Sequence, residues 1–114
     1  MALSRAVGKR LSHDPSAMLI ASIQALAGST CCVTLQREQP WASVTFSGIR
    51  HLIIIACSGP DKANYLGQLA SQLPDHDFAM TGHFVADVLI KDLIEDRLSL
   101  EILTLIDPRE TELD

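Results

Sequence analysis

Two histidines occupy matching places in two similar stretches of the chain. His51 lies in FSGIRHLIIIACSG (residues 46–59) and His83 lies in MTGHFVADVLI (residues 80–90). A neutral imidazole can act as a base or bind a metal near pH 7, and two strands can present histidine at the same end of a sheet. The pattern is consistent with a shared pocket, but two half-exposed strand-start residues are the favoured interpretation.

A carboxylate and two larger side chains complete the candidate pocket. Asp87 lies four residues after His83, so on a strand it faces the same side about 13 Å further along. Arg50 precedes His51 and faces the other side of its strand. A carboxylate in the apolar strand FVADVLI needs a partner, and Arg50 or Arg97 would supply one. The ligand-pocket candidates are therefore His51, His83, Asp87, Arg50 and Trp41.

No recognised catalytic or metal-binding motif accompanies these residues. The chain lacks H-E-x-x-H, P-loop and G-x-G-x-x-G sequences, and no nucleophile, histidine and acid form an identifiable set. A metal site needs three or four ligands at defined spacing, which His51, His83, His76 and Asp77 do not show. We therefore expect no metal, no cofactor and no catalytic residue. A non-enzymatic role is favoured over an enzymatic one.

The three cysteines and the segment after the last of them offer a weaker signal. Cys57 is followed by a Gly-containing turn into a helix N-terminus, where backbone N–H groups of Ser58 and Gly59 could bind an anion. A buried cysteine followed by an ordinary helix cap is the favoured interpretation. Cys31 and Cys32 point to opposite faces of a strand, so both are interpreted as small core residues. The spacing predicts no disulfide framework and a reducing environment.

Two helices are predicted to pack on the sheet that carries these candidate residues. The first begins after Asp14, a good N-cap residue that precedes proline, and ends at Gly28. Apolar residues recur between them at three- and four-residue steps, as on one face of a helix. In the second, Ser58 and Asp61 have the spacing of a capping box, and Pro74 ends the helix.

Alternating apolar residues predict five strands. The run at 50–57 is apolar on both faces and is predicted to be central, and Glu-Gln-Pro at 38–40 is predicted to turn the chain. The order α-β-β-β-α-β-β predicts an α+β fold, a two-layer sandwich whose mainly antiparallel five-stranded sheet carries two helices on one face. The strands are expected near residues 30–37, 41–47, 50–57, 83–94 and 98–106.

Length and composition limit the classes of protein. The 114 residues fit one domain at 14–107, with a flexible arm at 1–13 and a charged tail at 108–114. The net charge of −5 without a basic stripe argues against a nucleic-acid partner. The longest apolar run, Leu52 to Cys57, is too short to span a membrane. Because the N-terminus lacks an apolar signal region, we expect a cytoplasmic protein.

The predicted sheet has more apolar surface than two helices can cover. Trp41, Val85, Leu89 and Leu93 are expected on the face opposite the helices, and exposed apolar patches mark interaction surfaces. A second copy of the chain is the simplest cover, so we expect a homodimer. The favoured function is a small non-catalytic module that binds a protein or peptide partner. The alternative is a ligand-binding or enzymatic domain that uses the histidine pocket.

The order of the predicted elements is similar to that of the small acidic dimeric chaperones of type III secretion, which follow α-β-β-β-α-β-β-α. The resemblance is one of topology, it lacks the final helix, and no residues carry over. It implies a third hypothesis, a dimeric chaperone for a secreted protein, which rests on fold analogy because a fold does not specify a function.

Overall fold

The first helix, α2, spans Pro15–Ala27 in the computed structural model, which describes residues 14–108 of the chain. Asp14 caps it, because its carboxylate accepts a hydrogen bond from the backbone N–H of Ser16 at 3.0 Å. Gly28 ends it with a φ of +88°, a conformation that favours glycine. Both predicted helix ends are confirmed.

The second helix, α3, spans Lys62–Gln72 and continues into a short 3-10 helix, η1, at Leu73–Asp75. The predicted capping box is wrong. The carboxylate of Asp61 makes no capping hydrogen bond. The hydroxyl of Ser58 instead donates to the carbonyl of Thr30 at 3.3 Å, which ties this segment to the chain that follows α2.

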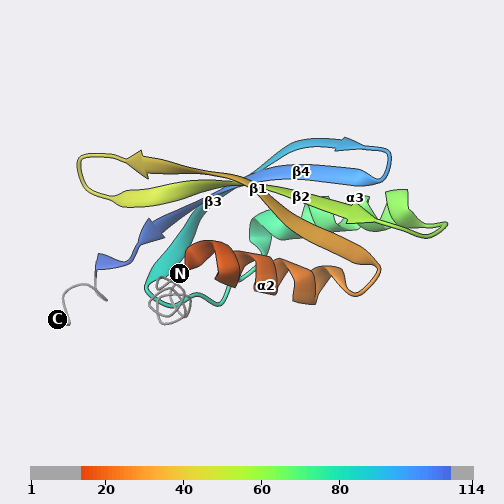
Figure 1. Cartoon of the computed structure of the whole chain (residues 1–114), viewed down its shortest axis with the longest axis horizontal. Helices are drawn as coiled ribbons and strands as arrows, with labels where there is room; N and C mark the ends of the chain where they lie inside the picture. The colour runs from red at the N-terminus through yellow and green to blue at the C-terminus, as the bar shows by residue number, and fades with distance from the viewer. Residues whose placement is uncertain (1–13, 109–114) are drawn as a thin grey trace, which may run out of the picture.

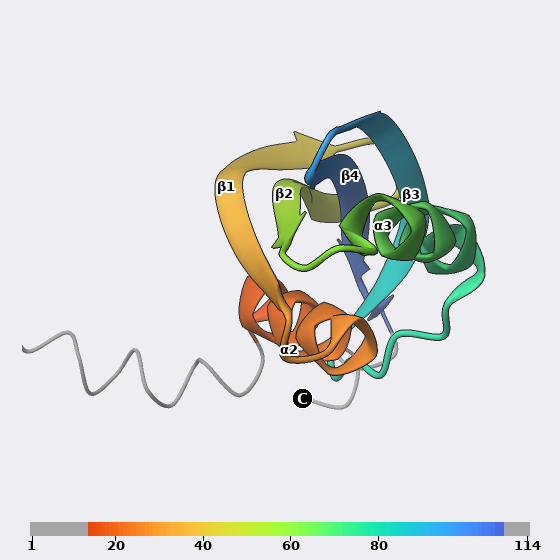
Figure 2. The same ribbon diagram turned by 90° about the vertical axis from the view of Figure 1, so that its right-hand side faces the viewer.

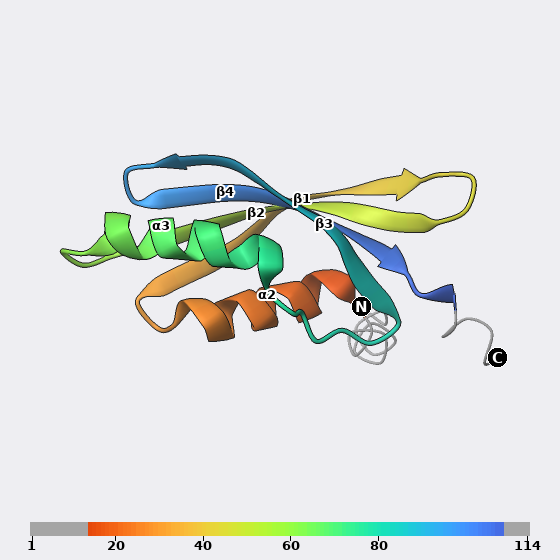
Figure 3. The same cartoon turned by 180° about the vertical axis from the view of Figure 1, so that it is seen from behind.

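Four strands form one antiparallel sheet in the order β1-β2-β4-β3, and both helices lie on the same side of it (Figures 1 and 3). The α+β class is confirmed. The predicted five strands and the order α-β-β-β-α-β-β are wrong, since the chain runs α-β-β-α-β-β. The topological similarity to secretion chaperones depended on that extra strand. The strands are β1 (Cys31–Ala42), β2 (Ser47–Cys57), β3 (His83–Ile94) and β4 (Arg97–Ile106).

The chain does not turn at residues 38–40, which explains the missing strand. These residues continue β1 and pair with β2. Pro40 is tolerated there because β1 is an edge strand, where a missing N–H need not break the sheet. The turn comes later, where the hydroxyl of Ser43 accepts hydrogen bonds from the backbone N–H groups of Thr45 and Phe46.

Three irregularities in strand pairing decide which side chains face the helices. The extra residues are Gln36 in β1 and Ala86 and Lys91 in β3. Because side chains alternate along a strand, each extra residue moves those that follow it to the other face. The bulge at Gln36 thereby places Glu38 opposite His51 on the face that the helices cover.

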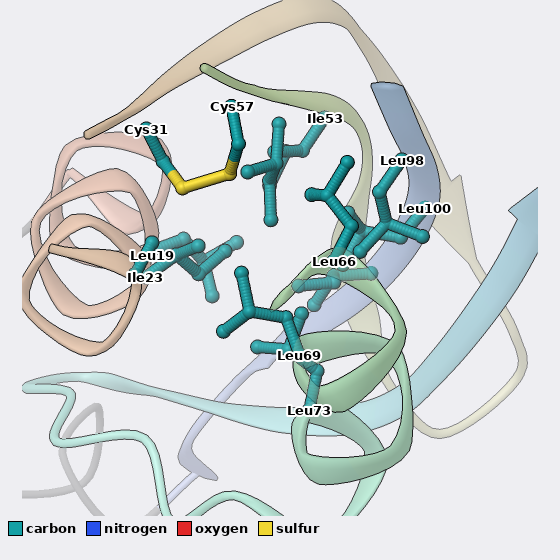
Figure 4. Close-up of a cluster of buried hydrophobic side chains, with 13 residues drawn as sticks. Leu19, Ile23, Cys31, Ile53, Cys57, Leu66, Leu69, Leu73, Leu98 and Leu100 are labelled. Atoms are coloured by element: carbon teal, nitrogen blue, oxygen red, sulfur yellow. A yellow bond between two sulfur atoms is a disulfide. The ribbon is translucent and has the colours of Figure 1, made fainter. Parts of the chain in front are cut away.

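The hydrophobic core lies between that face and the inner sides of α2 and α3 (Figure 2). Figure 4 shows the side chains of both helices pointing toward those of the sheet. Burying one such side chain contributes about 1.5–3 kcal/mol, so this layer holds the fold together. Its fully buried residues include Leu19, Ile23, Ile53, Ile55, Leu66, Leu73, Leu98, Leu100 and Ile102.

A disulfide joins the open end of the β1–β2 hairpin. Cys31 and Cys57 lie directly opposite each other with their Cα atoms 4.1 Å apart, and both are buried (Figure 4). The prediction of no disulfide is wrong, because strand register and not sequence spacing brings the two together. Cys32 is free and exposed. Disulfides are uncommon in a reducing cytosol, so this bond counts against the expected cytoplasmic setting.

Candidate functional site

His51 lies inside the molecule, on the face of β2 that the helices cover. Its exposed fraction is 0%. The prediction of a half-exposed histidine at the start of a strand is wrong for this residue, because β2 begins at Ser47 and the first turn of α2 packs over the imidazole. A ligand from solution therefore has no path to the ring in this structure.

Both ring nitrogens of His51 have hydroxyl partners. Nδ1 lies 2.9 Å from Oγ of Ser16 in the first turn of α2, and Nε2 lies 2.9 Å from Oγ1 of Thr104 on β4. The Ser16 hydroxyl also donates to the carboxylate of Glu38 on β1. These side chains form a continuous chain of hydrogen bonds across one helix and three strands. We call it the His51 network: Glu38, Ser16, His51 and Thr104.

The direction of each hydrogen bond follows from the number of protons available. Ser16 has one hydroxyl proton and gives it to Glu38, so it accepts from the N–H at Nδ1 of His51. Nε2 of the neutral ring then accepts from the hydroxyl of Thr104. Every member has a hydrogen-bond partner when the imidazole is neutral, and the network runs from the exposed Glu38 on β1 to the buried Thr104 on β4.

Burial lowers the pKa of His51 below its ordinary value of 6.5, because the charged ring would lose its water. The carboxylates of Glu38 and Asp14 act in the opposite direction, and His83 lowers the pKa further. Desolvation is the largest of these effects. The imidazole is therefore neutral at pH 7, in agreement with the pattern of donors and acceptors around it.

His83 is the neighbouring histidine, and it does begin a strand as predicted. Its charge acts on His51, and by register it lies on the helix-covered face. Nδ1 of His83 is buried and has no hydrogen-bond partner among residues 14–108. The structure thus brings the two histidines to one region of the sheet. The alternative of a pocket shared by the two histidines is not supported, because His51 is sealed by its own partners.

Asp87 is separated from the histidines by the bulge at Ala86. The prediction that it faces the same side as His83 is wrong, because the extra residue turns its side chain to the uncovered face of the sheet. Asp87 is exposed and lines a hollow of about 410 Å³ beside β3. His76 and Asp77 contribute to the same hollow from the loop after η1.

Arg50 and Trp41 also lie away from the histidines. Nη1 of Arg50 is 3.8 Å from Oε1 of Glu101 on the uncovered face, so its carboxylate partner is Glu101 and not the predicted Asp87. Trp41 is half-buried near the end of β1 and is opposite Gly48. The predicted five-residue pocket is therefore divided between the two faces of the sheet.

Ser58 and Gly59, the predicted anion site, line a smaller hollow of about 280 Å³ at the start of α3. The hollow also contains the carboxylate of Asp61, which would repel an anion, and the ammonium group of Lys62, which would attract one. The hydroxyl of Ser58 is already bonded to Thr30. Anion binding here stays a prediction.

Three members of the His51 network were not found from the sequence. Ser16 follows a proline in the first turn of a predicted helix, where a hydroxyl usually bonds to the backbone. Glu38 lies in a stretch predicted to turn, and Thr104 lies in an apolar strand. No local spacing connects positions 16, 38, 51 and 104. These residues come together only through the register of the strands and the packing of α2 on the sheet.

Within residues 14–108, no three His, Cys, Asp or Glu side chains are grouped so that they could hold a metal ion. No helix in this part of the chain is long and apolar enough to cross a membrane. Comparison with protein-family models, curated proteins and solved structures found no match for this chain. What the protein does must therefore follow from its own geometry.

Proposed function

We propose that this protein is a non-catalytic interaction module that forms a homodimer through the uncovered face of its sheet. The observation that supports it is the one-sided placement of the helices (Figure 3). Half-buried and exposed apolar side chains remain on the other face, which is typical of an interaction surface. We call this surface the open face; by strand register its apolar residues include Trp41, Leu52, Ile54, Phe84, Leu89 and Leu103. Val85 and Leu93 were predicted here, but they are opposite the buried Thr104 and Leu98 and so lie on the helix-covered face.

The edges of the sheet are poorly suited to pairing with another chain. The edge strand β1 contains Pro40 and the bulge at Gln36, and the edge strand β3 contains two bulges and the exposed charges of Asp87, Lys91 and Asp92. Proline, bulges and edge charges all oppose strand addition. A partner is therefore expected to pack against the open face.

A second copy of this chain fits the open face in area. Four strands about 4.8 Å apart and about 35 Å long present roughly 700 Å². Two such faces bury roughly 1,300–1,400 Å² in total, within the range of stable protein interfaces. The area is sufficient without any contribution from the helices.

The charges on the open face also suit a two-fold arrangement. Glu101 lies between Arg50 and Lys91, at 3.8 and 4.0 Å from their nitrogens. A two-fold interface brings the same patch of each copy together. Because both signs of charge are adjacent in this patch, Arg50 of one copy can face Glu101 of the other.

Light scattering after size exclusion, over a micromolar concentration range, tests the proposal. We expect a species near twice the 12.4 kDa chain mass. Leu89→Lys puts a charge in the open face and is expected to shift the population toward monomer. Val44→Lys is the matched control, because Val44 is fully exposed in the β1–β2 turn. A single 12.4 kDa species at every concentration, or equal loss of dimer in both variants, would contradict the proposal.

A further inference from the structure

The His51 network has a property that the proposed dimer does not use. Among the side chains of residues 14–108 that titrate near neutral pH, His51 is the one that is completely buried. Its position links the first turn of α2 to three strands through side-chain hydrogen bonds. A change in its charge would therefore act directly on the contact between helix and sheet.

The two ends of α2 are attached to the sheet in different ways. Near the C-terminal end, the amide of Gln24 donates to the carbonyl of Cys31 at 2.9 Å and accepts from the backbone N–H of Val33 at 3.3 Å. An amide does not titrate, so this attachment is insensitive to pH. At the N-terminal end the attachment is the bond of Ser16 to Glu38 and His51.

We propose that the His51 network is a pH-sensitive switch, which holds the first turn of α2 on the sheet while His51 is neutral and releases that turn when the imidazole takes up a proton. The inference is independent of the dimer. It concerns a movement within one chain, and the sheet and α3 are expected to stay folded throughout.

The groups around the imidazole determine how it responds to a proton. Asp14 at the cap of α2 and Glu38 on β1 attract the charged ring, His83 on β3 repels it when charged, and β4 contributes only the uncharged Thr104. The charged ring would also require the Thr104 hydroxyl to change from donor to acceptor. Desolvation outweighs the attraction, so the closed site disfavours the charge.

Opening the first turn of α2 relieves that penalty. Water then reaches the imidazolium and replaces the solvation that burial removes. Opening consequently becomes easier as the pH falls below the ordinary value of 6.5 for histidine. One proton limits the effect, since a group that titrates at 6.5 when open favours opening by at most about tenfold at pH 5.5 relative to pH 7.5.

Hydrogen–deuterium exchange of the full chain at pH 7.5 and 5.5, corrected for intrinsic exchange rates, tests the switch. We expect the protection of the amides at 16–20 to fall by up to about tenfold, with the amides of α3 and β4 unchanged. His51→Gln is expected to remove the pH dependence. His76→Gln is the matched control, because His76 also contacts α2, through Ser22 at 3.5 Å, and should leave the dependence intact.

Two results would overturn the switch. The first is protection at 16–20 that is the same at both pH values; the second is an equal loss of protection in all elements, which would indicate global unfolding. If His51→Gln does not fold, Thr104→Val decides, because it keeps the titrating ring and removes its Nε2 partner. The switch requires that the amides at 16–20 of Thr104→Val still lose protection at pH 5.5 relative to pH 7.5. Equal protection at both pH values, or an equal loss in all elements, would refute it.

Discussion

Oγ of Ser16 lies 2.9 Å from Nδ1 of His51, although the two residues are 35 positions apart in the chain. This contact connects the helix that begins the described fold to the second strand of its sheet. It also helps explain why His51 is not a surface ligand, because the hydroxyl occupies one ring nitrogen and the ring is completely buried.

The stability of the protein is expected to fall as the pH drops below 6.5. The pKa of His51 is lower in the folded state than the ordinary 6.5, so the unfolded state binds more protons below that value. The contribution of the neutral His51 to the free energy of unfolding is present above pH 6.5. It declines below that value, by at most about 1.4 kcal/mol at pH 5.5. Urea unfolding at pH 7.5 and 5.5 measures this, and His51→Gln should flatten the difference. An unchanged midpoint in the wild type would refute it.

Ser16→Ala should destabilise the fold, because it leaves the buried Nδ1 of His51 without its partner. We expect a loss of about 1–3 kcal/mol in the free energy of unfolding at pH 7.5. Ser58→Ala is the control: its hydroxyl is exposed and bonds only to the carbonyl of Thr30, so a change within about 0.5 kcal/mol is expected. Equal effects of the two variants would show that the network adds nothing to stability.

Gly48 lies inside β2, where it allows close approach of β4. A Cβ atom at this position would lie 2.0 Å from the carbonyl oxygen of Thr104. Gly48→Ala should separate the two strands locally and lower the melting temperature strongly. Gly67→Ala is the opposite control, because a Cβ there meets nothing within 4 Å and alanine favours a helix by about 0.5–1 kcal/mol. Thermal melts of both variants give the comparison; a stable Gly48→Ala protein would contradict it.

The Cys31–Cys57 disulfide should stabilise the fold mainly by restricting the unfolded chain. It closes a segment of 26 residues, for which the chain-entropy model gives about 3.5 kcal/mol. The double variant Cys31→Ala/Cys57→Ala should lose a stability of this order, and Cys32→Ala should not. Thiol titration of the unfolded chain, which is expected to detect one free thiol before reduction and three after, checks that the bond is present.

Much of the fold could be predicted from local signals. Asp14 and Gly28 mark the ends of α2 because capping chemistry acts over a few residues, and the hairpin tip at Glu95 follows from the alternation on either side. The extra predicted strand came from a proline at position 40, which is a turn residue in most contexts but is accommodated here at a sheet edge.

The candidate site could be predicted only in part. The sequence identified His51 as unusual, and it suggested that His83 lies at the same end of the sheet. It did not indicate that Asp87 faces away from both, because the bulge at Ala86 has no clear local signature and reverses the alternation after it. The partners of His51 likewise come from three other elements.

The amino-acid sequence by itself determined the α+β class and, within one residue, the boundaries of α2, β3 and β4. These depend on periodicity and capping, which are interactions between near neighbours. Only the tertiary structure decided that Cys31 meets Cys57 and that Ser16 and Glu38 enclose His51. Such pairs depend on strand register and bulges, and a shift of one residue moves every later side chain to the opposite face.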